Sequence, residues 1–187
     1  ETKQIKAYDL LNRGFTSYTI GDGKTLFATD HPLANGGTNA NRPVTGTDLN
    51  ETSLEAAVIQ MADWTDERGL LINAKPTNMI VPPDLRFVAQ RILNSTLRPD
   101  TANNDTNAVR DLGVVPGGYE VAYYLTDPNA WFLKTDVANG MKHFVRTKMK
   151  TGTDGDFDTG NFKYKGRERY SFGTSDPLGM WGNPGST

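Results

Sequence analysis

The chain contains no cysteine among its 187 residues, and its formal net charge is only −2. The absence of cysteine excludes disulfides, thiolate catalysis and cysteine-based zinc sites, and it fits assembly in a reducing cytoplasm. Because the chain has no overall basic footprint, contact with nucleic acid has to use a local patch. No apolar run approaches the roughly 20 residues that span a bilayer, so we expect no membrane partner.

Histidine is scarce, since the chain has only His31 and His143. A hydrolytic triad or a histidine-based metal centre therefore has few residues to use, and neither H-E-x-x-H nor G-x-S-x-G occurs. Asp30-His31 could form a carboxylate-oriented imidazole of the kind that catalysis and metal ligation use. Asp-His-Pro is more often a turn whose side chains bind the local backbone. We therefore expect no catalytic residue, metal or cofactor.

Glycine and proline, by contrast, are plentiful, with 19 and 10 residues, and they predict long irregular connections. The stretch 33–50, "LANGGTNANRPVTGTDLN", has no apolar periodicity, and loops of this length are usually functional or mobile. A chain of 187 residues fits one domain or one pair of intertwined subdomains. It begins with Glu1 and shows no signal-peptide pattern, so we expect a processed chain or a piece of a longer one.

Apolar residues at helical spacing predict three helices. The first ends near Gly14, and the second follows a capping-box pattern of Thr52 and Glu55 and ends near Gly69. The third follows a short buried strand at 79–81 and a Pro-Pro turn. The apolar stripes are Ile5, Tyr8, Leu11 and Phe15; Leu54, Ala57, Val58, Met61 and Trp64; and Leu85, Val88, Ala89, Ile92 and Leu93.

Strands are predicted mainly in the second half of the chain. "YEVAYYL" (119–125) and "NAWFLKTD" (129–136) flank a turn, and "KHFVRTKM" (142–149) follows them. Residues 162–172 are predicted as one long half-exposed strand or as two shorter ones. Because the strand at 79–81 leads directly into a helix, we expect a packed layer of helices and sheet, in an α+β fold.

Gly23-Lys24-Thr25 matches the end of a phosphate-binding Walker loop, which raises the alternative of a nucleotide-binding enzyme. The full motif has glycine five residues before Gly23, where this chain has Tyr18, and it needs a helix directly after it. The following residues instead run into Pro32. We prefer a tight turn at Asp22-Gly23, and we keep nucleotide binding by a degenerate P-loop as the alternative.

Asp154, Asp156 and Asp158 occupy the first, third and fifth positions of a loop that resembles an EF-hand. The sixth position is Thr159 instead of glycine, and the twelfth is Lys165 where a bidentate glutamate closes a calcium site. A solvated acidic loop between two strands is therefore the preferred interpretation. A calcium-stabilised binding module remains a second alternative.

Basic and aromatic residues alternate in the stretch 162–172. Such a pattern predicts either a stacking surface for single-stranded nucleic acid or a strand whose cations pair with carboxylates of a neighbouring subunit. The acidic stretch just before it favours the second. Aromatic and arginine-rich surfaces, long loops and little catalytic equipment are typical of an assembly subunit. The cations are Lys163, Lys165, Arg167 and Arg169.

An ordered series of fragments resembles the major capsid proteins of tailed bacteriophages, in particular the Mu-like major head subunits with the Hong Kong 97-type fold. Residues 11–41 are similar to that family's D-G-x-x-L-F-x-x-x-H-P/N segment, which is followed by a Gly/Asn loop. The matching positions are Asp22, Gly23, Leu26, Phe27, His31 and Pro32. Further similar fragments follow in the family's order: "SLEAAVIQM" to "ERGLLI", "NMIVPPDLRFVAQRILNS", "NNDTNAV", "LTDPNAWFLKTD" and "ERYSFGTSDPLGMWGNPG".

This resemblance implies an α+β shell protein with a peripheral and an axial domain and with no catalytic site. Residues 1–50 would hold the end of the spine helix and a peripheral segment. Residues 51–134 would form mainly the axial domain, and 135–187 would return to the peripheral domain with a C-terminal strand. The sequence has no counterpart of the family's N-terminal arm and extended loop, so we expect the fold without these two elements.

The resemblance also implies the function and the partners. Copies would assemble as pentamers and hexamers into an icosahedral virion head around double-stranded DNA, in the cytoplasm of a bacterial host. Portal, scaffold and decoration proteins are further candidate partners. Large assembly interfaces are anchored by aromatics and arginines. The candidate interface residues are Arg167, Arg169, Tyr170 and Trp181.

Overall fold

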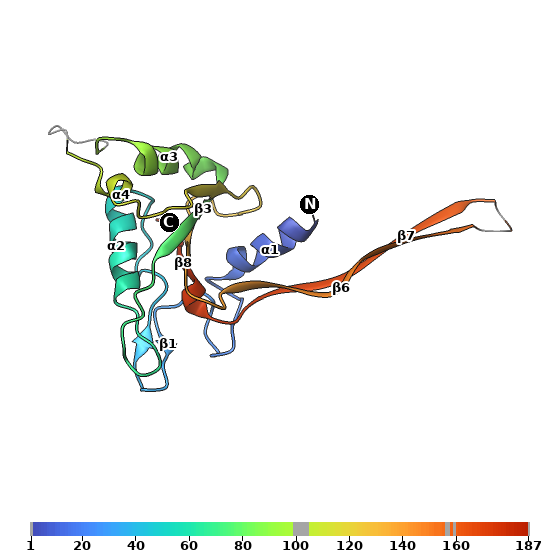
Figure 1. Cartoon of the computed structure of the whole chain (residues 1–187), viewed down its shortest axis with the longest axis horizontal. Helices are drawn as coiled ribbons and strands as arrows, with labels where there is room; N and C mark the ends of the chain where they lie inside the picture. The colour runs from blue at the N-terminus through green and yellow to red at the C-terminus, as the bar shows by residue number, and fades with distance from the viewer. Residues whose placement is uncertain (1, 99–104, 156–157, 159, 187) are drawn as a thin grey trace.

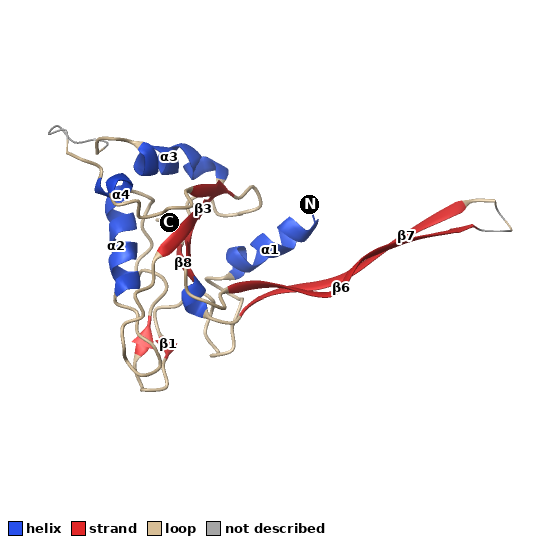
Figure 2. Ribbon diagram, viewed as in Figure 1, coloured by secondary structure: helices blue, strands red, loops and turns tan. Residues whose placement is uncertain are grey.

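The computed structural model describes residues 2–98, 105–155, 158 and 160–186 of the chain. It has two parts, a body and a long two-stranded arm that projects from it (Figure 1). The arm consists of β6 (Met141–Gly155) and β7 (Phe162–Thr174), and the body holds the other described elements. Helices and strands are mixed along the chain, as Figure 2 shows, so the α+β class is confirmed.

The body is built on a four-stranded mixed sheet in the order β4-β3-β5-β8. β3 (Pro76–Val81) pairs in parallel with β4 (Tyr119–Val121), and it pairs antiparallel with β5 (Trp131–Thr135). β5 in turn pairs antiparallel with β8 (Met180–Asn183), so the C-terminal segment forms one edge of the sheet. The short strands β1 (His31–Pro32) and β2 (Thr38–Asn39) pair apart from this sheet.

Side chains that alternate along these strands divide between two hydrophobic cores, one on each face of the sheet. On β5, Trp131 and Leu133 enter the first core and Phe132 enters the second. Residues of α2, α3 and α4 complete the first core, and α1 with the segment 15–28 completes the second. Burial of each large apolar side chain contributes about 1.5–3 kcal/mol, so the body carries most of the hydrophobic stabilisation.

The helices largely follow the apolar stripes. α1 spans Thr2–Arg13, α2 spans Glu51–Ala62, and α3 spans Arg86–Asn94 after a 3-10 turn at Pro83–Leu85. A single turn of helix, α4, covers Ala108–Asp111, and a second 3-10 turn covers Pro177–Gly179. The strand expected at 119–125 is shorter than predicted, because only β4 pairs with the sheet.

The predicted bounds of α2 are wrong at both ends. The capping box is formed by Asn50 and Ser53, since the Asn50 side chain accepts from the Ser53 N–H at 2.8 Å and the Ser53 hydroxyl accepts from the Asn50 N–H at 3.0 Å. The helix stops at Ala62 because Trp64 turns inward and donates its indole N–H to the Ala40 carbonyl at 2.7 Å. Tertiary contact therefore ends this helix before its apolar stripe does.

The arm confirms the predicted strands at 142–149 and 162–172 and resolves the second as one long strand. β6 and β7 pair antiparallel from Met141 opposite Thr174 to Gly155 opposite Phe162, with two bulges on the way. The foot of the arm crosses Gly179 so closely that a Cβ there would lie 2.2 Å from the Gly140 Cα. Only glycine fits this crossing, so it fixes where the arm leaves the body.

Candidate assembly surfaces

Alternation along β7 gives the arm two chemically different faces. The cationic face carries Lys163, Lys165, Arg167 and Arg169, and the aromatic face carries Phe162, Tyr164, Glu168, Tyr170 and Phe172. Arg167 lies in register with Lys150 of β6, so two cations sit side by side on the cationic face. Like charges opposite each other destabilise a strand pair, so an anion that approached Lys150 and Arg167 would stabilise this part of the face.

Helix α1 covers only the inner half of the aromatic face. Lys3 forms an ion pair with Glu168, and its ammonium lies 5.4 Å from the centre of the Tyr170 ring. Farther out, the side chains of Phe162 and Tyr164 are 79% and 84% exposed. These two neighbouring open rings make the outer aromatic face a candidate contact surface.

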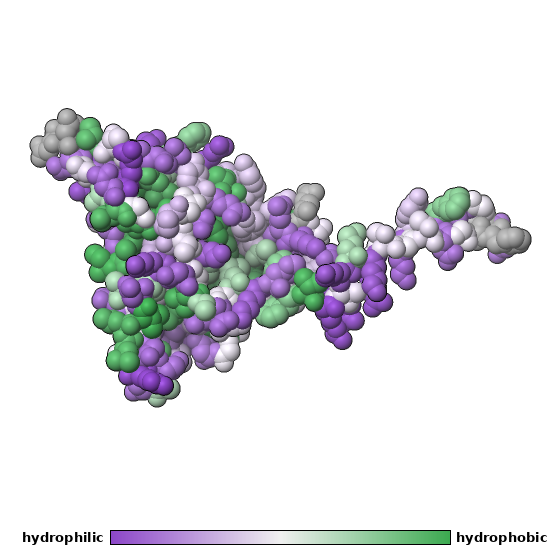
Figure 3. All heavy atoms as spheres, viewed as in Figure 1, coloured by the Kyte–Doolittle hydropathy of each residue, from purple (hydrophilic) through white to green (hydrophobic). Residues whose placement is uncertain are grey.

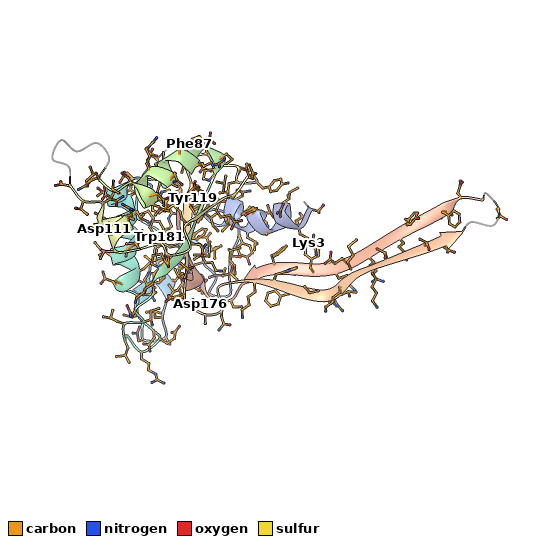
Figure 4. The ribbon with its side chains drawn as sticks, turned by 45° about the horizontal axis from the view of Figure 1, so that its top comes forward. Lys3, Phe87, Asp111, Tyr119, Asp176 and Trp181 are labelled. Carbon is orange, nitrogen blue, oxygen red and sulfur yellow. The ribbon has the colours of Figure 1, made fainter. Side chains whose placement is uncertain are left out.

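The four candidate interface residues have different positions in the structure. Arg167 and Arg169 are exposed on the cationic face, whereas Tyr170 is half-buried and faces α1. Trp181 is only 1% exposed, packs against Trp131 with ring centres 4.9 Å apart, and donates its indole N–H to Gln60 at 2.8 Å. Its side chain therefore belongs to the body's own core within one subunit, and its role at an interface stays a prediction (Figure 4).

The Gly23-Lys24-Thr25 segment does not have the geometry of a phosphate-binding loop. Gly23 adopts φ +79° in a turn, and Thr25 forms a bridge back to Thr19. The Lys24 ammonium pairs with Asp30, and no helix follows before Glu51. A P-loop requires a helix N-terminus directly after the motif, so the tight turn is confirmed and the nucleotide-binding alternative loses its structural basis.

His31 belongs to a buried polar cluster centred on Asn41. Its Nδ1 lies 2.6 Å from the Asp22 carboxylate and its Nε2 lies 3.1 Å from the Asn41 Oδ1. The Asn41 Nδ2 donates to three backbone carbonyls, while its Oδ1 accepts from the Ala28 N–H at 2.9 Å. Because this network fixes the amide orientation, the His31 Nε2 is a donor. The cluster connects the segment 22–41 to the C-terminal segment. His31 therefore has a structural role.

A groove of about 540 Å³ opens on the body beside the foot of the arm. Its walls come from the segments 22–39, 65–72, 136–137 and 175–178. Among the residues that the structure describes, no lysine or arginine lines this acidic groove. The acidic side chains that line it are Asp22, Asp66, Glu67, Asp136 and Asp176.

The predicted calcium site falls partly outside the described residues, because Asp156 is one of those that the structure leaves out. Asp154 lies in β6 opposite Lys163, in a strand and not in a loop. Within the described ranges, no group of three histidine or acidic side chains is placed to hold a metal ion. In those same ranges, none of the helices is both long and apolar enough to span a membrane.

An α+β body that carries a long, partly uncovered arm has the architecture of a subunit. The comparison with protein families agrees, because the family described as "Phage capsid protein" matches residues 1–183. The chain therefore belongs to the phage capsid protein family. Membership implies a structural role in the capsid of the virion, and not an enzymatic one.

No curated protein sequence matches the chain. Among solved structures, a virus-like particle from Pyrococcus furiosus is similar at 13% sequence identity, with a TM-score of 0.44. The similarity covers 76% of this chain and 55% of the other, so the chain spans about half the length of that protein.

Proposed function

We propose that this capsid protein is the subunit of an icosahedral phage head with the Hong Kong 97-type fold of the Mu-like branch. Copies assemble into pentamers and hexamers that enclose double-stranded DNA. Residues 51–134 contribute mainly the axial domain, and residues 1–50 and 135–187 contribute the peripheral domain. Family membership over residues 1–183 supports a capsid role, and the arm is the observation that carries self-assembly.

The arm supports self-assembly because its long strands gain little stabilisation within one subunit. Its strands have 15 and 13 residues, well above the usual 5–6 or so, and in the part of the chain that the structure describes each pairs with one strand alone. A two-stranded ribbon of this kind is at best marginally stable in water. Contact with a neighbouring subunit would bury the open parts of both faces and supply the missing stabilisation.

A projecting arm suits the ring symmetry of a shell, because it can contact a different surface of the next copy. An arm that reaches from one copy onto a different surface of the next makes a heterologous contact, and such contacts close into rings when the rotation is right. Pentamers and hexamers are rings of this type. Packaged DNA, a portal, a scaffold and decoration proteins are further partners in this proposal, and assembly takes place in the host cytoplasm.

The proposal can be tested by light scattering on the purified chain over a concentration series, with electron micrographs of the heaviest fraction. The comparison variant lacks residues 146–169, with Val145 and Tyr170 joined by Asn-Gly. These two residues are register partners, and Asn-Gly favours a two-residue hairpin turn. The shortened hairpin should therefore close without disturbing the fold of the body.

We expect rings or shells from the intact chain and only small species from the shortened variant, with the body still folded by circular dichroism. A strictly monomeric intact chain at all concentrations would contradict the proposal. Assembly that is equal in both chains would show that the arm does not carry it.

A further inference from the structure

Two cations of the arm, Arg167 and Arg169, are the ones available to an acidic partner from outside the subunit. Among the described residues, no ion pair is recorded for Arg167 or Arg169, although both are exposed on the cationic face. Arg167 also faces Lys150 across the strand pair. The repulsion between these two cations is relieved when carboxylates approach the same face.

The acidic groove has the complementary charge, and backbone hydrogen bonds orient three of its carboxylates. The Asp136 Oδ1 accepts from the Lys75 N–H at 2.8 Å, and the Asp176 Oδ1 accepts from the Leu178 N–H at 2.9 Å. Hydrogen bonds from the Leu70 and Arg68 N–H groups to Asp66 hold the pKa of this carboxyl below its usual value. Each of these carboxylates uses one oxygen for the local backbone, so the second can bind an incoming cation.

Within one copy, the outer cations of the arm lie far from the acidic groove. The groove includes Ser175 and Asp176, which directly follow the arm (Figure 4). Arg167 lies seven residues before Thr174, so it is about 23 Å along the strand from the foot. The space-filling view shows the arm extended away from the body (Figure 3). The cations and the groove can therefore meet only between two copies.

We propose that the cationic face of β7 in one copy docks in the acidic groove of a second copy, beside the foot of the second copy's arm. This inference rests on the proposed self-assembly and names the surfaces that carry it. Cations on one face of a strand recur every 6.6 Å or so, and the groove offers several carboxylates to neighbouring cations of that face. The contact is heterologous, as a ring requires.

The most direct test uses the absence of cysteine, because a single introduced cysteine is then unique in each chain. One variant carries Arg167→Cys, and the other, with a tag, carries Ser175→Cys. Ser175 is exposed in the groove, and the change is nearly isosteric. After mixing, a short bis-maleimide reagent is added, and dimers of mixed mass are counted. The matched control replaces Ser175→Cys by Thr52→Cys, an exposed residue in a different hollow near α2.

We expect mixed dimers with Ser175→Cys and far fewer with Thr52→Cys. Light scattering on the same samples distinguishes failure of the docking proposal from failure of the proposed self-assembly. If the chains assemble but Arg167→Cys links to neither site, this docking is wrong and the proposed function stands. If the chains are monomeric at every concentration, the proposed function fails, and the docking fails with it.

A second experiment isolates the charge. Asp136→Asn with Asp176→Asn keeps both backbone acceptors and removes two charges, and we expect the concentration at which assembly begins to rise about tenfold. The matched control is Asp127→Asn, an exposed aspartate that also caps a backbone N–H but lies outside the groove, and it should change nothing. An unchanged onset in the double variant would overturn the proposal.

DNA is the competing partner for the cationic face. If Arg167→Glu with Arg169→Glu abolishes binding of a short DNA duplex but leaves the onset of assembly unchanged, the arm meets nucleic acid and the docking proposal is overturned. If the same variant delays assembly in the absence of DNA, a second copy is the partner.

Discussion

The body and the arm are both built on β-strands, but the strands are stabilised differently. In the body, β5 has a strand on each side, and Phe132 and Leu133 are buried on opposite faces. In the arm, β6 and β7 pair with each other alone among the described strands, and helix α1 contacts the inner half of one face. The difference teaches that the core of the body is buried within one subunit, whereas in the proposed assembly the arm takes its missing contacts from another copy.

The largest effect on the body is expected from Trp181→Ala, which removes a buried ring from the sheet and from the first core. Loss of a buried tryptophan costs about 3–5 kcal/mol, and the free energy of unfolding should fall by that amount. Urea unfolding measures the change. Trp181→Phe is the matched control, and it should lose less because it retains a ring against Trp131. A loss below about 1 kcal/mol for Trp181→Ala would contradict the core position.

Asn41→Ala should lower the free energy of unfolding by about 3 kcal/mol, because each buried partner left unpaired costs about 1–3 kcal/mol. The substitution leaves the three carbonyls, the Ala28 N–H and the His31 Nε2 without their partner. Thermal unfolding tests this. Asn35→Ala is the matched control in the same loop, since Asn35 is exposed and accepts only from the Gly37 N–H. Equal losses for both variants would disprove the special position of Asn41.

Tyr8 connects α1 to β4, and its effect depends on pH. Burial, followed by the hydrogen bond to Glu120, raises the pKa of Tyr8 from 10.0 to about 12. A raised pKa means that this stabilisation is complete below pH 10 and is lost as the pH rises from 10 to about 12.

Tyr8→Phe should therefore cost at most about 1 kcal/mol at neutral pH and should flatten the loss of stability between pH 10 and 12. Urea unfolding at several pH values measures this, with Tyr123→Phe as the exposed control. A pH dependence that is unchanged by Tyr8→Phe would contradict the assignment.

The smallest effect on folding is expected from Tyr164→Ser on the outer arm. The side chain has no cover in the subunit, so the free energy of unfolding should change by no more than about 0.5 kcal/mol. Assembly should nevertheless begin at a higher concentration, as light scattering can show. Tyr123→Ser removes a similarly exposed tyrosine from the body and should leave assembly unchanged. The reverse pattern would place the assembly surface on the body.

Local patterns in the sequence predicted where helices and strands lie better than they predicted the tertiary contacts of these elements. The apolar stripe of Leu54, Ala57 and Met61 and the buried strand at 79–81 were sufficient for α2 and β3, because these residues face a core. The end of α2 was wrong because the contact of Trp64 with the Ala40 carbonyl is tertiary. The length of β6 was missed for a similar reason, since its polar outer half pairs with β7 without an apolar signal.

For the candidate assembly surfaces, too, local patterns were predicted and contacts between distant segments were missed. Alternating cations and aromatics in 162–172 predicted a two-faced strand, and Arg167 and Arg169 are exposed on one face as expected. The sequence could not reveal that Trp181 is buried, because an interface anchor and a core tryptophan have the same local pattern. The acidic groove and the Asn41 cluster were also missed, since each joins segments that lie far apart in the chain.

The central claim is that the body is complete in one copy and that the arm is completed by another. Amide hydrogen exchange, measured residue by residue at a dilute and a concentrated condition, tests it most directly. We expect the amides of β3 and β5 to be protected in both, and those of β6 and β7 to exchange rapidly when dilute and to become protected when concentrated. Equal and strong protection of the arm in the dilute monomer would contradict the claim.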